Sequence, residues 1–109
     1  MEKKVTYADI LTQVLRTEST HQPHRLPIRV VSVCDVETNQ FLLIATGWEN
    51  KRRVETILFH ARLVENKVVI EDDNIEEGLT GKLIDAGISS DDVLTALAFE
   101  RSKNNSVAA

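Results

Sequence analysis

The sequence predicts an α+β fold: an N-terminal helix, a four-stranded antiparallel meander, a second helix and a C-terminal strand. Three observations predict it. Apolar residues recur at helical spacing near the N-terminus, apolar β-branched runs separated by short polar turns follow, and an acidic stretch leads into a glycine-terminated helix. Helices packed on such a meander form an α+β domain. At 109 residues the chain is long enough for one core and too short for two, so we expect a single domain over residues 1–109.

The first helix is predicted from the spacing of its apolar residues, which form one helix face: Tyr7, Ala8, Leu11, Val14 and Leu15. Thr6 is a suitable N-cap because its hydroxyl can accept a hydrogen bond from the first turn. The helix should end before Pro23, and residues 21–27 should form an irregular connector because two prolines block its continuation.

Three strands should follow, at Ile28–Val36, Gln40–Glu49 and Arg53–Glu65, and a fourth at Lys67–Glu71. The segments between them are short and polar, as in β-hairpins. Several strands carry apolar residues at both alternating positions, so parts of both sheet faces should be dry. Two helices cover only about one face. We therefore expect a homo-oligomer, most simply a homodimer.

The second helix should begin in an acidic stretch, with Asp73 or Asn74 as its N-cap and Glu76 or Glu77 at the capping-box position. Gly78 and Gly81 would then lie one turn apart inside this helix. The alternative interpretation of Asp72, Asp73, Glu76 and Glu77 is a site for a divalent cation, which prefers several converging oxygen ligands. Ionised carboxylates this close repel one another, so the structural interpretation is favoured and no cofactor is predicted.

The helix should stop at Gly87, the left-handed residue past the last turn, with Ile88 folding back onto Leu83 in a Schellman motif. Residues 89–92 should form a single helical turn before a strand-like run at Val93–Phe99. The segment 102–109 is predicted to be a frayed tail.

Composition excludes several function classes. The formal net charge of −4 argues against a free-standing nucleic-acid binder, because phosphate contacts need a concentrated basic face. No apolar run is long enough for a membrane span or a signal peptide, so a cytoplasmic protein is expected. There is no Walker loop, Cys-x-x-Cys pair or nucleophile triad pattern. The single cysteine, Cys34, is expected to be a buried reduced thiol.

Histidines offer no catalytic pattern. His21 and His24 flank a proline but have no third ligand at a spacing typical of zinc sites. His60 lies inside a strand, on the face of Leu58 and Arg62 by alternation, where a polar contact is favoured over general-base chemistry.

Trp48 is the candidate binding residue. It is the only tryptophan, it follows Gly47, and it precedes the basic pair Arg52 and Arg53. Packing in the core or at the sheet edge is the alternative interpretation. Tryptophan beside arginine is typical of interface hot spots, so Trp48, Arg52 and Arg53 are predicted to contact a protein partner.

The order of these pieces resembles the XisI-like family, known as fdxN element excision controlling factors. The resemblance runs from about Val5 to Phe99. It is carried by Tyr7, the apolar strand ending in Gly47-Trp48, Arg52-Arg53, residues 66–70, Asp72 with Glu76-Glu77-Gly78, Ala86-Gly87-Ile88 and Asp91-Asp92-Val93-Leu94. The segment from Glu100 to Asn105 departs from the family's pattern.

The resemblance implies a non-catalytic accessory protein that controls the programmed excision of a DNA element in cyanobacteria. It also implies an XisH-like companion with a nuclease-like fold. The negative net charge predicts that contact with DNA is indirect or weak. Two alternatives remain at this point: an antitoxin-like regulator that silences a nuclease partner, and a metal-dependent nuclease or hydrolase that uses the acidic cluster with His60.

Overall fold

The structure is a computed structural model that describes residues 5–21 and 28–107. Its elements follow one another along the chain as α1 (Tyr7–His21), β1 (Ile28–Asp35), β2 (Gln40–Glu49), β3 (Arg52–Val64), β4 (Lys67–Asp73), α2 (Thr80–Asp85), the 3₁₀ turn η1 (Ser90–Asp92), β5 (Val93–Thr95) and α3 (Ala96–Val107). Most of the predicted connector at residues 21–27 lies outside the described residues.

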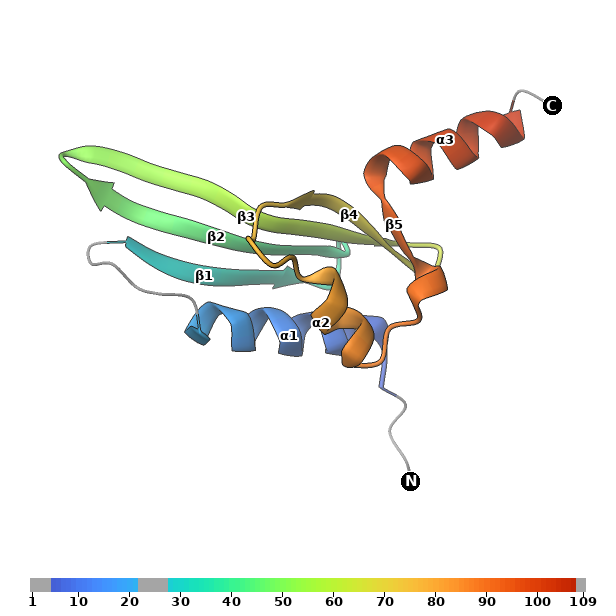
Figure 1. The fold of residues 1–109 in the computed structure, drawn as a ribbon, viewed down its shortest axis with the longest axis horizontal. Coiled ribbons are helices and arrows are strands. Elements are labelled where there is room, and N and C mark those ends of the chain that lie inside the picture. The colour runs from blue at the N-terminus through green and yellow to red at the C-terminus, as the bar shows by residue number, and fades with distance from the viewer. Residues whose placement is uncertain (1–4, 22–27, 108–109) are drawn as a thin grey trace.

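The five strands form one sheet in the order β1-β2-β3-β4-β5 (Figure 1). The first four strands are antiparallel, which confirms the predicted meander, whereas β5 runs parallel to β4 after the α2 crossover. Both tight hairpins use positive φ angles at their two turn residues, Asn50 and Lys51 in one and Glu65 and Asn66 in the other. Such turns match the twist of the strands that they join.

Helices α1 and α2 lie on one side of the sheet, and α3 stands on the other side at the β4–β5 end (Figure 1). The side chains buried between the sheet and the first two helices belong to one cluster: Ile10, Leu11, Leu15, Phe41, Leu43, Phe59, Ala61, Val68, Leu79, Leu83 and Ile88. Val69 is also fully buried but lies outside this cluster, in the strand that α3 contacts.

The start of α1 confirms the sequence prediction. Thr6 Oγ1 accepts a hydrogen bond from the Asp9 backbone N–H (3.1 Å), and Asp9 Oδ2 accepts one from the Thr6 N–H (3.2 Å). This reciprocal pair is a capping box with an aspartate in place of the usual glutamate.

The end of α2 is confirmed as well. The Ile88 N–H donates to the Leu83 carbonyl (3.1 Å), and the Gly87 N–H donates to the Ile84 carbonyl (3.0 Å). These are the two bonds of a Schellman motif. Gly87 has φ +125°, and a Cβ there would lie 3.3 Å from Ile10 Cδ1, so the backbone conformation and the close approach of α1 both favour glycine.

The predicted start of α2 is wrong. The helix begins at Thr80, and its N-cap position, Leu79, has no side-chain cap. Gly78 has φ +75° and precedes the helix, so only Gly81 of the two glycines is helical. The cause is Asp73, whose carboxylate accepts hydrogen bonds from the backbone N–H groups of Ile75 (3.3 Å) and Leu79 (2.9 Å). The carboxylate closes an irregular loop instead of capping a helix.

The last strand is shorter than predicted. It ends at Thr95, where the chain turns into α3, and Thr95 Oγ1 accepts a hydrogen bond from the Ala98 N–H (3.1 Å). Phe99 is therefore a helical residue, 7% exposed. The predicted tail from residue 102 belongs to α3 as far as Val107.

Among the described ranges 5–21 and 28–107, no helix has the length and apolar character of a membrane span. Cys34 is partly buried and faces α1. Burial raises the pKa of its thiol, while a hydrogen bond with Thr12 acts in the opposite direction.

Candidate functional site: the β2–β3 ribbon and the open sheet face

The tip of the β2–β3 hairpin is a two-stranded ribbon that extends past the rest of the sheet (Figure 1). Strand β1 begins at Ile28, which pairs with Gly47. In the part of the chain that the structure describes, the residues of β2 after Gly47 pair only with β3. Trp48 and Arg53 form one pair of this ribbon, and Glu49 and Arg52 form the next. The ribbon therefore carries the sequence-predicted contact residues away from the core.

Trp48 is 52% exposed, which excludes it from the core. The guanidinium of Arg53 lies over its indole ring, 5.7 Å from the ring centroid. Arg53 Nη2 also donates a hydrogen bond to Thr46 Oγ1 (2.9 Å), which fixes the arginine in this position. A cation–π contact contributes about 0.5–1 kcal/mol at an exposed site, so the pair presents a largely preorganised surface.

Arg52 does not share this surface. Neighbouring residues of a strand point to opposite faces, so Arg52 and its pair Glu49 lie on the other face of the ribbon from Trp48 and Arg53. The structure brings together two of the three predicted contact residues and separates the third.

The ribbon continues into what we call the open sheet face: the residues of β1, β2 and β3 that point away from α1 and α2. By register these are Arg29, Val31, Val33, Asp35, Gln40, Leu42, Ile44, Thr46, Trp48, Arg53, Glu55, Ile57, His60 and Arg62. Burial alternates along β1 as the register requires. Val31, Val33 and Ile57 are 37%, 41% and 39% exposed, which is high for apolar strand residues.

A bulge in β3 decides which residues reach this face. Leu43 pairs with Phe59 but Ile44 pairs with Ile57, so Leu58 is the extra residue. Leu58 packs against the core cluster, and Ile57 takes the exposed position. The predicted alternation that placed Leu58 on the face of His60 is therefore wrong.

His60 makes the polar contact that the sequence predicted. Its Nε2 lies 2.7 Å from Gln40 Oε1 in a hydrogen bond across the strands. Nearby, Arg62 Nε donates to Glu71 Oε2 (3.0 Å) in an ion pair at the same end of the sheet. These contacts form a polar border to the apolar centre of the face.

The acidic cluster does not converge. Asp72 pairs with His60 on the open face, Asp73 turns toward the loop before α2, and Glu76 and Glu77 are exposed in that loop. Within residues 5–21 and 28–107, no three His, Cys, Asp or Glu side chains are placed to hold a metal ion.

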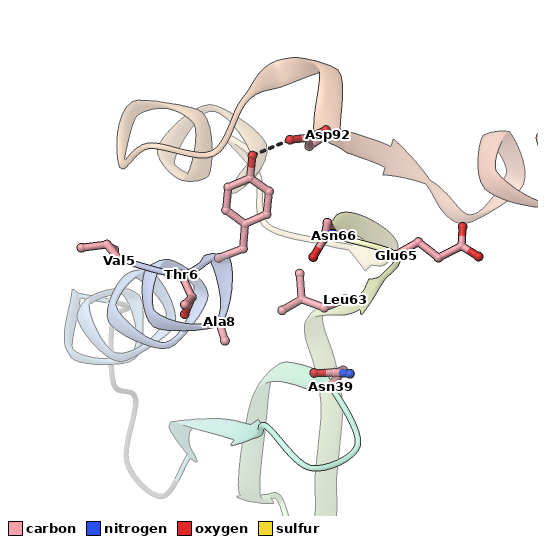
Figure 2. A pocket seen from close by; sticks show the side chains of 9 residues that line it. Val5, Thr6, Ala8, Asn39, Leu63, Glu65, Asn66 and Asp92 are labelled. Carbon is pink, nitrogen blue, oxygen red and sulfur yellow. Dashed lines mark hydrogen bonds between the residues drawn. The ribbon is translucent and has the colours of Figure 1, made fainter. Parts of the chain in front are cut away.

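A separate pocket of about 560 Å³ lies at the other end of the molecule, beside the start of α1 and the β1–β2 and β3–β4 turns (Figure 2). In it the Tyr7 hydroxyl donates to Asp92 Oδ2 (2.5 Å) and accepts from the Ser89 N–H (3.3 Å). Lys67 Nζ donates to Asp92 Oδ1 (3.2 Å). No local sequence pattern predicts this cluster, because Tyr7 and Asp92 are 85 positions apart along the chain.

The Tyr7–Asp92 bond predicts a specific pH dependence. The bond raises the pKa of the Tyr7 phenol above 10.0 and, with help from Lys67, lowers the pKa of the Asp92 carboxyl below 3.8. Tyr7 is the only tyrosine, so phenolate absorbance reports it alone. We expect a titration midpoint above 10.0 that falls in Asp92→Asn.

The sign of the linkage follows from these shifts. Stability from Tyr7 is present below its unfolded-state pKa and is lost as pH rises through the higher folded value. Stability from Asp92 is present above its unfolded-state pKa and is lost as pH falls through the lower folded value. A wild-type phenol midpoint at or below that of free tyrosine would contradict the hydrogen bond.

Residues 1–108, nearly the whole chain, match the XisI family, whose description is "XisI protein". The chain belongs to the XisI family. No curated protein matches it. Two crystal structures from Anabaena variabilis ATCC 29413 resemble the XisI-family fold seen here. A XisI-like protein is 16% identical with a TM-score of 0.74, and the alignment covers 81% of each chain. The fdxN element excision controlling factor XisI is 20% identical with a TM-score of 0.65, and the alignment covers 81% of this chain and 80% of that one.

The structure explains three of the sequence pieces that carry the resemblance to the XisI-like family. Gly47-Trp48 marks the point where the sheet narrows to a ribbon. In the segment from Asp72 to Gly78, Asp73 closes the loop, and Gly78 supplies the positive φ that the loop needs; a Cβ at Gly78 would lie 3.5 Å from Asp73 Oδ2. The Ala86-Gly87-Ile88 piece is the Schellman stop of α2.

Proposed function

We propose that this XisI-family protein is a non-catalytic factor that controls the excision of a DNA element, and that it does so by binding a nuclease-like companion of the XisH type. Membership of the family supports the role in excision control, since one XisI structure bears the name of an fdxN element excision controlling factor.

The observation that carries the proposal is the Trp48–Arg53 pair. Tryptophan and arginine are the residues most enriched in interface hot spots, and such residues work best when they are held in place before binding. Here the indole is half exposed, Arg53 lies over it, and Thr46 holds Arg53. The ribbon that carries the pair extends beyond the sheet, where a partner has access to it (Figure 1).

Charge favours a protein partner over direct DNA binding. The formal net charge is −4, and Arg52 and Arg53 point to opposite faces of the ribbon, so they do not form one basic face. Duplex DNA needs several phosphate contacts from one surface for appreciable affinity at physiological salt. The isolated chain should therefore bind duplex DNA weakly.

The test is Trp48→Ala, measured by calorimetric titration against the purified XisH-like companion. The exposed indole contributes little to folding, so the melting temperature should stay within a few degrees, while the affinity should fall about 30-fold or more, as for a hot-spot residue. The same surface should be needed for the excision or cleavage activity of the complex, whether the effect on that activity is activating or inhibitory.

Arg52→Ala and Arg53→Ala form a matched pair for this test. The two arginines are adjacent in sequence but lie on opposite faces, so Arg53→Ala should weaken binding and Arg52→Ala should not. Equal losses in both variants would point to general charge attraction. If Trp48→Ala binds the companion with full affinity, the ribbon is not part of the interface.

A further inference from the structure

Within residues 5–21 and 28–107, no helix covers the open sheet face. Helices α1 and α2 occupy the opposite side of the sheet. Helix α3 packs closely against β4 and β5. Figure 1 shows α3 standing away from the body on the side opposite α1 and α2. Strands β1, β2 and β3 therefore present their outward side chains to solvent.

The centre of this face is apolar. Val31 pairs with Ile44, which pairs with Ile57, and Val33 pairs with Leu42 in the next row. The eight residues of β1 set the length that the three strands share. With strands about 4.8 Å apart and about 3.3 Å per residue, the face presents roughly 400 Å² of sheet. Two such faces bury about 800 Å² before side-chain relief is counted, close to the roughly 1,000 Å² that a specific interface needs.

The two ends of the face carry opposite charge. At the ribbon end, Arg29 and Arg53 with Glu55 leave one net positive charge. At the other end Glu71 neutralises Arg62, which leaves Asp35 and Asp72 as two negative charges. Asp35 accepts hydrogen bonds in the β1–β2 turn, and the one from the Thr38 side chain contributes most to lowering the pKa of its carboxyl, so it is ionised at neutral pH.

With an apolar centre and two ends of opposite charge, the open sheet face is complementary to a second, reversed copy of the same face. We propose that a second copy of this chain covers the open sheet face, packed face to face about a two-fold axis that lies perpendicular to the strands. Only that axis reverses the strand direction, so that the basic end of one copy lies over the acidic end of the other. An axis along the strands would place acid over acid, which electrostatic complementarity disfavours.

The reversed arrangement places specific residues together. When the apolar rows of the two copies overlap, β1 lies over the partner's β1, and Arg29 lies near the partner's Asp35. Trp48 and Arg53 are one row further out than Arg29, so the ribbon tip extends beyond the last row of the partner's β1 and β2. Trp48 thus stays beyond the partner's β1 and β2, whereas Arg53 lies opposite the end of the partner's β3, which continues to Val64. The dimer does not depend on the proposed companion.

The mass of the purified chain in solution tests the dimer. Light scattering and sedimentation over about 1–100 μM should show a dimer that dissociates in the micromolar range, as expected for a small interface. Ile57→Asp buries a charge at the centre of the face and should weaken dimerisation about 100-fold or more. Val5→Asp is the control, since Val5 is 69% exposed and lies beside the start of α1; its mass should match wild type.

The position of the second copy is tested by comparing two strands. Ile57 is on β3, in the middle of the sheet, whereas Val33 is on β1, which forms the sheet's edge. Face packing predicts that Ile57→Asp and Val33→Asp both yield monomers with native circular dichroism. A dimer that persists in Ile57→Asp and is lost in Val33→Asp would place the second copy on the β1 edge and overturn the proposal. A wild-type monomer at every concentration would overturn it too.

The orientation of the axis is tested with charge variants of exposed residues. Arg29→Glu should weaken the dimer about 10-fold or more, because the new carboxylate faces the partner's Asp35. Adding Asp35→Asn removes that repulsion while keeping a side chain that can close the turn, so the double variant should dimerise more tightly than Arg29→Glu alone. If Asp35→Asn gives no such recovery, the reversed packing is wrong.

Discussion

Replacing Phe59 with alanine is expected to lower the free energy of unfolding by about 3–5 kcal/mol, the largest effect predicted for a single substitution in this chain. The Phe59 ring is fully buried and lies opposite Leu43 at the centre of the sheet, where α1 and α2 pack. Chemical denaturation followed by circular dichroism measures the loss.

A conservative variant separates cavity formation from any effect on the bulge. Phe59→Leu keeps most of the apolar volume and should cost far less than Phe59→Ala. Because a domain of this size has only about 5–15 kcal/mol of stability, the alanine variant should unfold at markedly lower denaturant concentration. A loss below about 1 kcal/mol would mean that the core repacks around the site.

The second largest effect is expected at the Glu18–Lys82 ion pair, which joins α1 to α2. Glu18 is only 5% exposed, and Lys82 Nζ lies 2.7 Å from its Oε2. Lys82→Met keeps the apolar stem but removes the ammonium, so the carboxylate stays buried without this partner. We expect the free energy of unfolding to fall by about 1–3 kcal/mol, since the lysine itself is half exposed.

A double variant isolates the charge effect. Glu18→Gln with Lys82→Met removes the buried charge together with its counter-ion, so it should be more stable than Lys82→Met alone. Both are compared by thermal and chemical denaturation at neutral pH. If the single and double variants are equally destabilised, loss of the hydrogen bond between Lys82 and Glu18, and not the charge of the buried carboxylate, is the cause.

Local sequence patterns predicted the meander because each signal acts over a few residues. Gln40–Glu49 is a strand with the predicted bounds, and Thr6 and Gly87 begin and end their helices as expected. Short-range chemistry decides such features: a hydroxyl that reaches the first turn, or a glycine that accepts a positive φ.

The start of α2 could not be predicted in this way. Acidic residues before an apolar run are typical of helix starts. The Asp73 carboxylate, however, accepts hydrogen bonds from the backbone N–H groups of Ile75 and Leu79 and holds the segment in a loop. Likewise, the run after Val93 has strand-like composition, but it pairs with β4 only as far as Thr95. The backbone partners available after folding decided both outcomes.

For the candidate site, the sequence by itself determined the composition: a lone tryptophan beside two arginines after an apolar strand, and strands with apolar residues at both alternating positions. Only the tertiary structure decided which of these residues act together. Strand alternation places Arg53 on the same face as Trp48 and Arg52 on the opposite face. The β3 bulge exposes Ile57 in place of Leu58. Helices α1 and α2 both lie on one side of the sheet, which leaves the other side of β1, β2 and β3 open. The physical reason is that which face a residue lies on depends on register, bulges and helix placement, which pairing and packing between distant segments determine.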